Sequence, residues 1–143
     1  MTTDDRAQAV AFNRGVIEEF RANAGQVGGR FAGMPMLLLT TTGARSGEPR
    51  TSPLGYLADG DRRLVFGTNA GRHDHPQWYL NLLTTPEVTV EVGTERYPAV
   101  ATPLTGEERH RAWAAQVARA PMFADYQTAT NREIPVVALT PEA

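Results

Sequence analysis

The densest group of polar residues runs from Thr40 to Thr51, with the sequence TTTGARSGEPRT. It places Arg45, Arg50, two glycines and several hydroxyl groups around a predicted strand–turn–strand connection. Glycines allow successive backbone N–H groups to point into one concavity, and arginines and hydroxyls add strong hydrogen bonds to a phosphate. The segment therefore suggests an anion site, with a plain hairpin carrying solvated arginines as the alternative. It is not a Walker loop, because the lysine and the glycine spacing are missing.

A second polar cluster runs from Gly67 to Pro76, with the sequence GTNAGRHDHP. It ends a predicted strand and enters a predicted helix, so free backbone amides are expected at the start of that helix. His73, Asp74 and His75 raise the question of a metal ion. Adjacent residues on a turn rarely converge on one ion, so a solvated turn is the simpler interpretation and no metal site is predicted.

Two further segments combine aromatic and polar residues at helical spacing. Trp78 lies on one side of a helix with Asn81 near it, and core packing is the simpler role for Trp78. The late residues Met122, Phe123 and Tyr126 form either a hydrophobic face or a wall of a substrate pocket. The only two serines lie outside any nucleophile elbow, and the three histidines are scattered. The lack of a hydrolytic group favours a cofactor that carries out the difficult step.

The composition bounds the class of protein. The 143 residues are 41% hydrophobic and 21% charged, as in one soluble globular domain. The net charge of −2 argues against a nucleic-acid binder, yet all fourteen cationic residues are arginines, which suit local anion binding. Without cysteine, disulfides, thiolate nucleophiles and cysteine-bound metals are excluded. No apolar run approaches the length of a membrane span and no signal peptide is visible, so we expect a cytoplasmic protein. Acidic residues argue against firm membrane attachment of the first helix.

The helices and strands that position these residues are predicted from the spacing of apolar residues and from the glycines and prolines that interrupt it. Helices are predicted over 4–22, from Pro76 to about residue 84, from a capping box at Thr105 and Glu108, and over 122–129. A glycine-rich loop covers residues 24–30. Strands are predicted over 36–42, 49–57, 64–66, 88–92, 97–102 and 134–139. About six strands with hairpin turns and peripheral helices favour a mainly β (α+β) split antiparallel barrel, with a sandwich as the alternative.

The ordered blocks of this chain resemble the deazaflavin-dependent nitroreductase family, also described as F-420-dependent quinone reductases. The blocks are LLLTTTGARSGEPRTSPLGYLADGDRRLVFGTNAG, HPQWYLNLLTTPEVTVEVG, LTGEERHRAW and ADYQTATNREIPV, within residues 31 to 140. The ordered set of blocks is specific to this family, whereas any one block alone would be weak evidence of membership. The resemblance implies a split barrel over 31–143, preceded by an N-terminal helix and loop over 1–30. It also implies coenzyme F-420 as the cofactor, and hydride transfer to a quinone, enone or nitro-type acceptor.

The resemblance assigns roles to several segments. The first turn would hold the cofactor's phosphate, the second strand would lie along the ring, and the second polar cluster would form another anion cradle. The cofactor-binding residues would be Arg45, Ser46, Arg50, Pro53, Leu54, Thr68, Asn69, Ala70, Gly71, Gln77, Trp78 and Asn81. Phe123 and Tyr126 would line the substrate pocket, and Tyr126 or water would supply the proton.

This sequence departs from the family pattern at several positions. Many members have a second basic residue where Ala44 stands, and some have a lysine where Asn69 stands, so a weaker grip on a polyanionic tail is expected. The late helix has Ala120, Phe123 and Tyr126 where the best-known nitroreductase has tyrosines, which favours a quinone or enone over a nitro compound.

Other interpretations stay open at this point. FMN or haem could occupy the same barrel, and the protein could carry or sense F-420 without turnover. A monomer and a homodimer are both compatible with the sequence.

Overall fold

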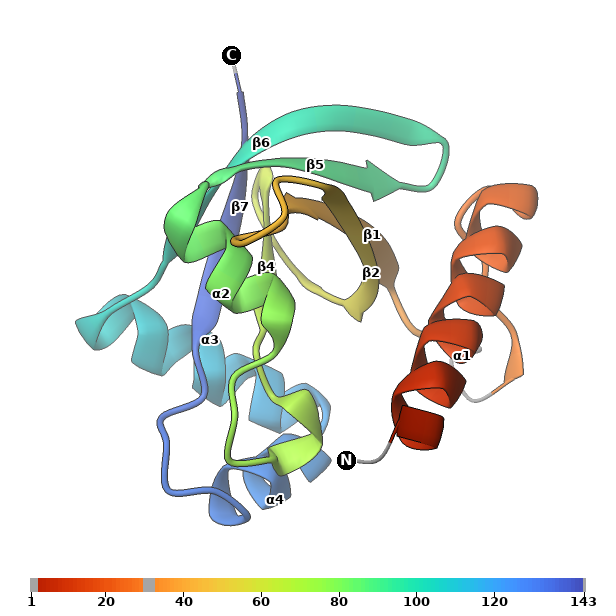
Figure 1. Cartoon of the computed structure of the whole chain (residues 1–143). Coiled ribbons are helices and arrows are strands. Elements are labelled where there is room, and N and C mark those ends of the chain that lie inside the picture. Colours follow the sequence, from red (N-terminus) through yellow and green to blue (C-terminus); the bar gives the residue numbers. More distant parts are fainter. Residues whose placement is uncertain (1–2, 30–32, 143) are drawn as a thin grey trace.

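The computed structural model describes residues 3–29 and 33–142, with side chains from Val10 onward. Seven antiparallel strands form one sheet in the order β2-β1-β5-β6-β7-β4-β3 (Figure 1). The strands are β1 (Met36–Thr42), β2 (Pro49–Gly55), β3 (Leu57–Asp59), β4 (Arg62–Phe66), β5 (Glu87–Val92), β6 (Glu95–Pro103) and β7 (Val136–Pro141). The expected mainly β, split-barrel architecture with peripheral helices is confirmed.

The sheet curls because its two edge strands are neighbours in the chain. β2 and β3 lie at opposite ends of the strand order, yet only Tyr56 separates them in sequence. The edges must therefore approach each other, and β2 contacts β4. The extended stretch predicted over 49–57 is thus two strands, one paired with β1 and the other with β4. This break gives seven strands where the sequence predicted about six.

The strand β1 is buried on both of its faces, which explains its continuous apolar run. Leu37 and Leu39 point into the barrel interior, where they pack with the core of the other strands. Met36 and Leu38 point outward, and Phe20 of the first helix covers them. The same alternation holds in β7, so the first four residues of each of these strands are all apolar.

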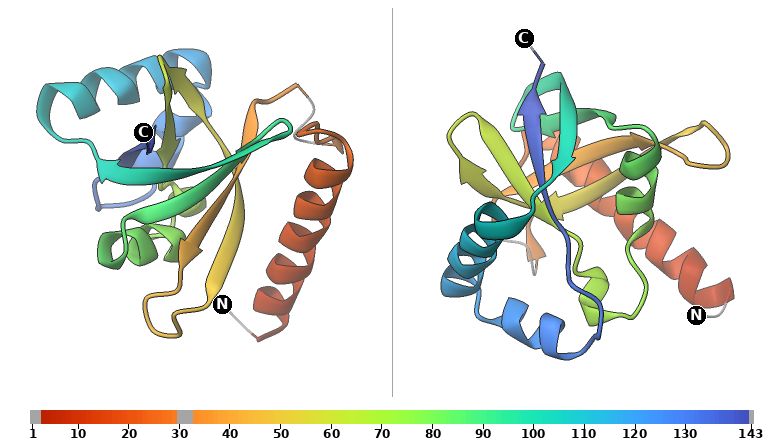
Figure 2. Two further views of the ribbon diagram at one scale, coloured as in Figure 1. Left: turned by 90° about the horizontal axis from the view of Figure 1, so that it is seen from above. Right: turned by 90° about the vertical axis from the view of Figure 1, so that its left-hand side faces the viewer.

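The helices form layers on two sides of the barrel (Figure 2). They are α1 (Thr3–Ala22), α2 (Gln77–Thr84), α3 (Gly106–Arg119) and α4 (Met122–Thr128), with a short 3-10 turn η2 (Asn69–Gly71). α1 lies against β1 and β2, whereas α3 packs against β7 and α4 against η2. In the described part of the chain, no helix combines the length and the apolar character needed to cross a membrane. The boundary predicted between residues 30 and 31 lies outside the described residues, and the division into two parts stays a prediction.

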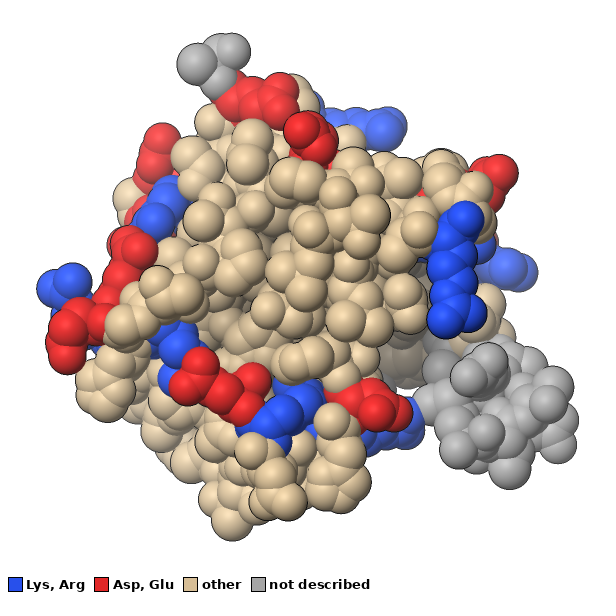
Figure 3. Space-filling model, turned by 60° about the vertical axis from the view of Figure 1, so that its left-hand side comes forward, with Lys and Arg blue, Asp and Glu red and all other residues tan. Residues whose placement is uncertain are grey.

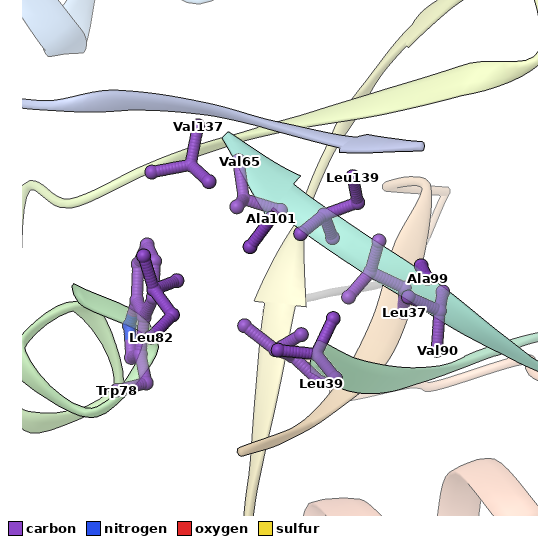
Figure 4. Packing of buried hydrophobic residues seen from close by; sticks show 11 residues of the cluster. Leu37, Leu39, Val65, Trp78, Leu82, Val90, Ala99, Ala101, Val137 and Leu139 are labelled. Carbon is purple, nitrogen blue, oxygen red and sulfur yellow. The ribbon is translucent and has the colours of Figure 1, made fainter. Parts of the chain in front are cut away.

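The helix α2 is anchored in the barrel core. Trp78 and Leu82 are one helical turn apart and reach toward Leu39 and Val137 (Figure 4). Trp78 is 7% exposed and Leu82 is 1% exposed. The position of α2 is therefore fixed relative to the end of β1, and the face of α2 that carries Asn81 lies beside the polar turn that follows β1.

Three local predictions were wrong in detail. Pro76 is the cap of α2 with extended backbone rather than its first helical residue. Thr105 precedes α3 as expected, but its side chain makes no capping hydrogen bond, so the capping box does not form. The last strand begins at Val136 instead of residue 134, because Pro135 has no N–H to donate and Gly67 pairs with its carbonyl instead.

Candidate functional site

Three adjoining hollows form one trough along α2. The first, of about 710 Å³, lies between α2 and the turn that joins β1 to β2. The second, of about 380 Å³, lies between α1 and β2, and the third, of about 1110 Å³, between β2 and the loop after β4. Gln77 lines all three, so the hollows are continuous. The two polar segments singled out by sequence thus meet the same trough at different ends.

The turn between β1 and β2, residues 43–48, is closed by two backbone hydrogen bonds. The Gly43 N–H donates to the Glu48 carbonyl at 2.8 Å, and the Gly47 N–H donates to the Gly43 carbonyl at 2.9 Å. Ser46 Oγ accepts from the Glu48 N–H at 3.1 Å and from Arg50 Nη2 at 3.5 Å, which leaves its own hydrogen free to donate. Among the described residues, the N–H groups of Arg45 and Ser46 have no acceptor. The turn therefore offers two amides, a hydroxyl and two guanidinium groups to an anion.

Gly43 is required for this geometry because a methyl group there would meet the Ser46 hydroxyl. An added Cβ at Gly43 would lie 2.6 Å from Ser46 Oγ. We expect Gly43→Ala to displace the hydroxyl and to weaken binding of a phosphate-bearing cofactor about two- to twelvefold, the worth of one hydrogen bond. Fluorescence titration measures the change. Gly15→Ala, where nothing lies within 4 Å, is the control, and equal affinities of the two variants would contradict the assignment.

Asn81 connects α2 to this turn. Its side chain is 1% exposed, and its Oδ1 accepts from the Ala44 N–H at 3.0 Å and from Gln77 Nε2 at 2.9 Å. Its Nδ2 donates to Thr41 Oγ1 at 3.1 Å. The amide thereby fixes the turn, the end of β1 and the Gln77 side chain relative to one another. Asn81 is a positioning residue as well as a wall of the first hollow.

The loop after β4 exposes backbone amides to the third hollow. Asn69 and Ala70 have positive φ angles of 46° and 55°, which non-glycine residues rarely adopt. Thr68 precedes them in the right-handed region, and such a change of hand turns successive N–H groups into one concavity. The N–H groups of Asn69 and Ala70 have no acceptor among the described residues. This loop is the second candidate anion cradle, and strain of this kind is typical of functional sites.

His75, at the entrance to α2, is held neutral. Its Nδ1 lies 3.1 Å from Arg132 Nη1, and arginine can only donate, so the ring nitrogen accepts. Burial, and then the positive charge of Arg132, lower the pKa of His75 below its ordinary value of 6.5. The ring of Tyr79 packs beside it, with centroids 4.8 Å apart.

The lowered pKa of His75 predicts that acid destabilises the fold. Because the unfolded chain takes up the proton more readily, the contribution of His75 is present above about pH 6.5 and is lost as the pH falls through its lower folded-state pKa. We expect the free energy of unfolding to fall between neutral and mildly acidic pH, and to fall less in His75→Gln. Denaturant titrations at each pH measure it, with His110→Gln, on an exposed face of α3, as the control. Identical pH dependence in His75→Gln and in the unaltered protein would contradict the prediction.

The charge of the trough is opposite to the net charge of the chain. Four arginines line it, against one carboxylate, Asp74; the four are Arg14, Arg45, Arg50 and Arg72. None of the four forms an ion pair within the described part of the chain. The face shown in Figure 3 carries acidic and basic side chains around its edge and neither kind in its centre. Unpaired cations along a recess favour an extended anionic ligand.

Most of the predicted cofactor residues lie together. All of them line the trough except Gly71, which is buried with φ 75° beneath α4, where an added Cβ would lie 3.1 Å from Ala129. Phe123 and Tyr126 are not among the residues that line it. Phe123 packs edge-on against Phe66, with centroids 5.8 Å apart, and the Tyr126 hydroxyl lies 3.6 Å from the Met122 sulfur. No group of three or more His, Cys, Asp or Glu side chains in the described residues could hold a metal ion.

No residue of α1 was among the predicted site residues, yet α1 contributes a wall of the trough. Asn13 and Arg14 line it, beside Val10 and Ile17. A signal was present, because Arg14 lies four residues after Val10 and three before Ile17, and so shares their face of the helix. An arginine inside an apolar stripe indicates a place where the stripe borders a polar recess.

Comparison with known proteins gives consistent matches. A family model described as F-420H(2)-dependent quinone reductase matches residues 12–141. An F-420H(2)-dependent quinone reductase of Mycobacterium tuberculosis is 38% identical over 125 residues, which cover 85% of this chain and 84% of that protein.

Two solved structures are similar in both sequence and fold. An F-420-H2 dependent reductase, FDR-A, is 39% identical with a TM-score of 0.68, covering 73% of this chain and 93% of that one. A chain described as a domain-swapped dimer is 34% identical with a TM-score of 0.70, and the match covers 96% of this chain and 99% of that one.

Proposed function

Because the chain belongs to the F-420H(2)-dependent quinone reductase family, we propose that its trough binds coenzyme F-420 and that the protein reduces a quinone with it. It is an oxidoreductase whose acceptor is a small organic molecule. The observation that carries the proposal is the set of four arginines along the trough, none of them in an ion pair with another described residue, in a chain of net charge −2.

The residues present fit a phosphate-bearing cofactor with a flat ring. The turn over residues 43–48 supplies the donors for the phosphate, namely the free amides, the Ser46 hydroxyl and the side chains of Arg45 and Arg50. The third hollow has an apolar wall of Pro53, Leu54 and Trp78, which suits the ring. The amides of Asn69 and Ala70 form the second cradle, for a polar edge of the ring or an anionic substituent.

The reaction asks little covalent chemistry of the protein. Reduced coenzyme F-420, when bound, supplies the hydride. The chain's own residues hold donor and acceptor in line, which is the main contribution that a protein makes to such a transfer. The phosphate donors lie away from the apolar wall, so they fix the position of the ligand without entering the chemistry.

The acceptor side of the site involves α4 in this proposal. Phe123 and Tyr126 stay the predicted substrate residues, and Phe66 supports this because it lines the third hollow and contacts the Phe123 ring. Of the two expected proton sources, water reaches the half-exposed walls of the trough directly, whereas the Tyr126 hydroxyl faces Met122. We therefore assign protonation of the reduced acceptor to water. The cytoplasmic location and the choice between monomer and homodimer stay predictions.

The test is turnover. Purified protein is mixed with reduced F-420 and a panel of quinones, enones and nitroaromatics, and cofactor oxidation is followed by absorbance. We expect at least one quinone to be reduced, and quinones to be better acceptors than nitro compounds. Tight binding without oxidation by any quinone would instead identify a carrier or sensor of F-420.

A further inference from the structure

Arg132, in the segment between α4 and β7, contacts more of the second cradle than any residue assigned so far. Its guanidinium donates to three backbone carbonyls, those of Gly67, Thr68 and Arg72, at 3.0, 2.9 and 3.0 Å. A fourth contact joins it to His75 Nδ1. The side chain is half-buried, and burial lowers its pKa while Asp74 opposes that effect. It does not line the trough itself.

The geometry points to Arg132 as a positioning residue for the cofactor: it fixes the peptide planes of residues 67–72 so that the Asn69 and Ala70 amides face the trough. This inference rests on the proposed function. It assigns a role to a side chain that lies behind the binding surface rather than on it.

The physical step is the planarity of the peptide bond. In a trans peptide the carbonyl and the following N–H point in opposite directions. The Thr68 carbonyl points at the guanidinium, so the Asn69 N–H must point away from it. Asn69 lines the third hollow, and its N–H has no acceptor among the described residues. A carbonyl held on one side therefore presents a donor on the other.

The strained backbone explains why a fork of donors is needed. Asn69 and Ala70 both have left-handed φ angles without being glycine, a strained conformation that persists only where the surrounding structure enforces it. Two backbone hydrogen bonds, Gly71 N–H to the Thr68 carbonyl and Arg72 N–H to the Asn69 carbonyl, hold the turn from inside. Arg132 holds it from outside at both ends. Lysine has the charge but carries its three donors on one nitrogen, so it does not match carbonyls that contact three separate nitrogens of the guanidinium.

The chain offers a matched control in Arg109. This arginine is also half-buried and also donates to backbone of the same region, the Ile134 carbonyl at 2.6 Å, but it has no contact with residues 67–72. Removing either guanidinium removes backbone hydrogen bonds near β7. Of the two arginines, only Arg132 donates its hydrogen bonds to the segment 67–72 that forms the cradle.

The test compares Arg132→Gln, Arg132→Lys and Arg109→Gln with the unaltered protein by fluorescence titration with F-420 and by thermal unfolding. We expect Arg132→Gln to raise the dissociation constant at least about tenfold, with Arg132→Lys between it and the unaltered protein. Arg109→Gln should lower the unfolding temperature and leave the dissociation constant unchanged. A merely structural role would reduce the number of binding sites per protein, not the affinity of each site. An unchanged dissociation constant in Arg132→Gln would overturn the inference.

A second measurement does not depend on the cofactor. Inorganic phosphate is titrated while the backbone amide resonances of Asn69 and Ala70 are followed by NMR. We expect both to shift in the unaltered protein and in Arg109→Gln, and neither in Arg132→Gln. Equal shifts in Arg132→Gln would overturn the inference, whereas failure of the unaltered protein to bind F-420 would overturn only the proposed function.

Discussion

Replacing Arg45 and Arg50 together by alanine is expected to weaken binding of coenzyme F-420 by more than about 100-fold. Each guanidinium can make a charge-assisted hydrogen bond worth about 1.5–3 kcal/mol, and both line the hollow beside the turn. Arg50 also donates to Ser46 Oγ, which orients the hydroxyl toward the same point. Fluorescence titration gives the dissociation constants. The single variant Arg45→Ala should lose about 10- to 150-fold on the same basis.

The control for this prediction changes the net charge equally but elsewhere. Arg96 and Arg111 are exposed and do not line the trough. Their double alanine variant should bind F-420 almost as the unaltered protein does. Affinity should also fall with rising ionic strength, and less steeply in Arg45→Ala/Arg50→Ala, because exposed charges are screened by salt. A double variant of Arg45 and Arg50 with unchanged affinity would remove the phosphate assignment.

Asn81→Ala is expected to damage stability and binding together. Thr41, 2% exposed, loses the donor to its oxygen and keeps only the 3.5 Å bond from its hydroxyl to the Arg50 carbonyl, and an unsatisfied buried polar group costs about 1–3 kcal/mol. The Ala44 amide and Gln77 lose the shared acceptor that fixes the turn against α2. We expect the free energy of unfolding to fall by about 2–3 kcal/mol and F-420 affinity to fall about tenfold or more. Denaturant unfolding and titration measure the two effects.

The variant Asn81→Asp separates the loss of the hydrogen bonds that fix the turn from the loss of anion binding. The carboxylate keeps an acceptor for the Ala44 amide and for Gln77, and the Thr41 hydroxyl can rotate to donate, so the hydrogen bonds that fix the turn are retained, while burial of the new charge lowers stability. The new negative charge lies at the wall of the first hollow, where the phosphate is proposed to bind, and repels an anionic ligand. Affinity should therefore fall at least as far as in Asn81→Ala, although the hydrogen bonds that fix the turn are kept. If Asn81→Asp binds F-420 as tightly as the unaltered protein, Asn81 does not adjoin the anion.

The parts of the fold that were predictable depend on local pattern. The continuous apolar run of β1 and the alternation of β5 identify a doubly buried and a half-buried strand, and both elements form as expected. The break at Tyr56 was not predictable in the same way. Strand partners are chosen by the curled sheet, not by the local sequence, and the extended run shows no residue that forces a change of partner. The capping box at Thr105 has the right spacing, but its hydrogen bond is missing where Gly106 takes a φ of 58°.

In the candidate site, too, the features set by local sequence were predictable and those set by the tertiary fold were not. The geometry of the turn over residues 43–48, the candidate anion site, could be predicted because its glycines, hydroxyl and arginine are contiguous in sequence, so local structure brings them together. The roles of Asn81 and Arg132 could not, since their partners lie about 40 and about 60 residues away and only the tertiary fold joins them. Arg14 is intermediate, because its position in an apolar stripe is local but the wall it completes is not. Phe123 and Tyr126 were grouped by helical spacing, which a helix packed against an aromatic core satisfies equally well.

If the arginine-lined trough binds a deazaflavin in preference to other flavins, coenzyme F-420 and FMN must differ in affinity for the protein. Purified protein is titrated with coenzyme F-420 and, in parallel, with FMN, and the fluorescence of each ligand is followed to saturation. We predict saturable binding of F-420 at one site per chain, with a dissociation constant well below that for FMN. Tighter binding of FMN, or no saturable binding of F-420, would contradict the account.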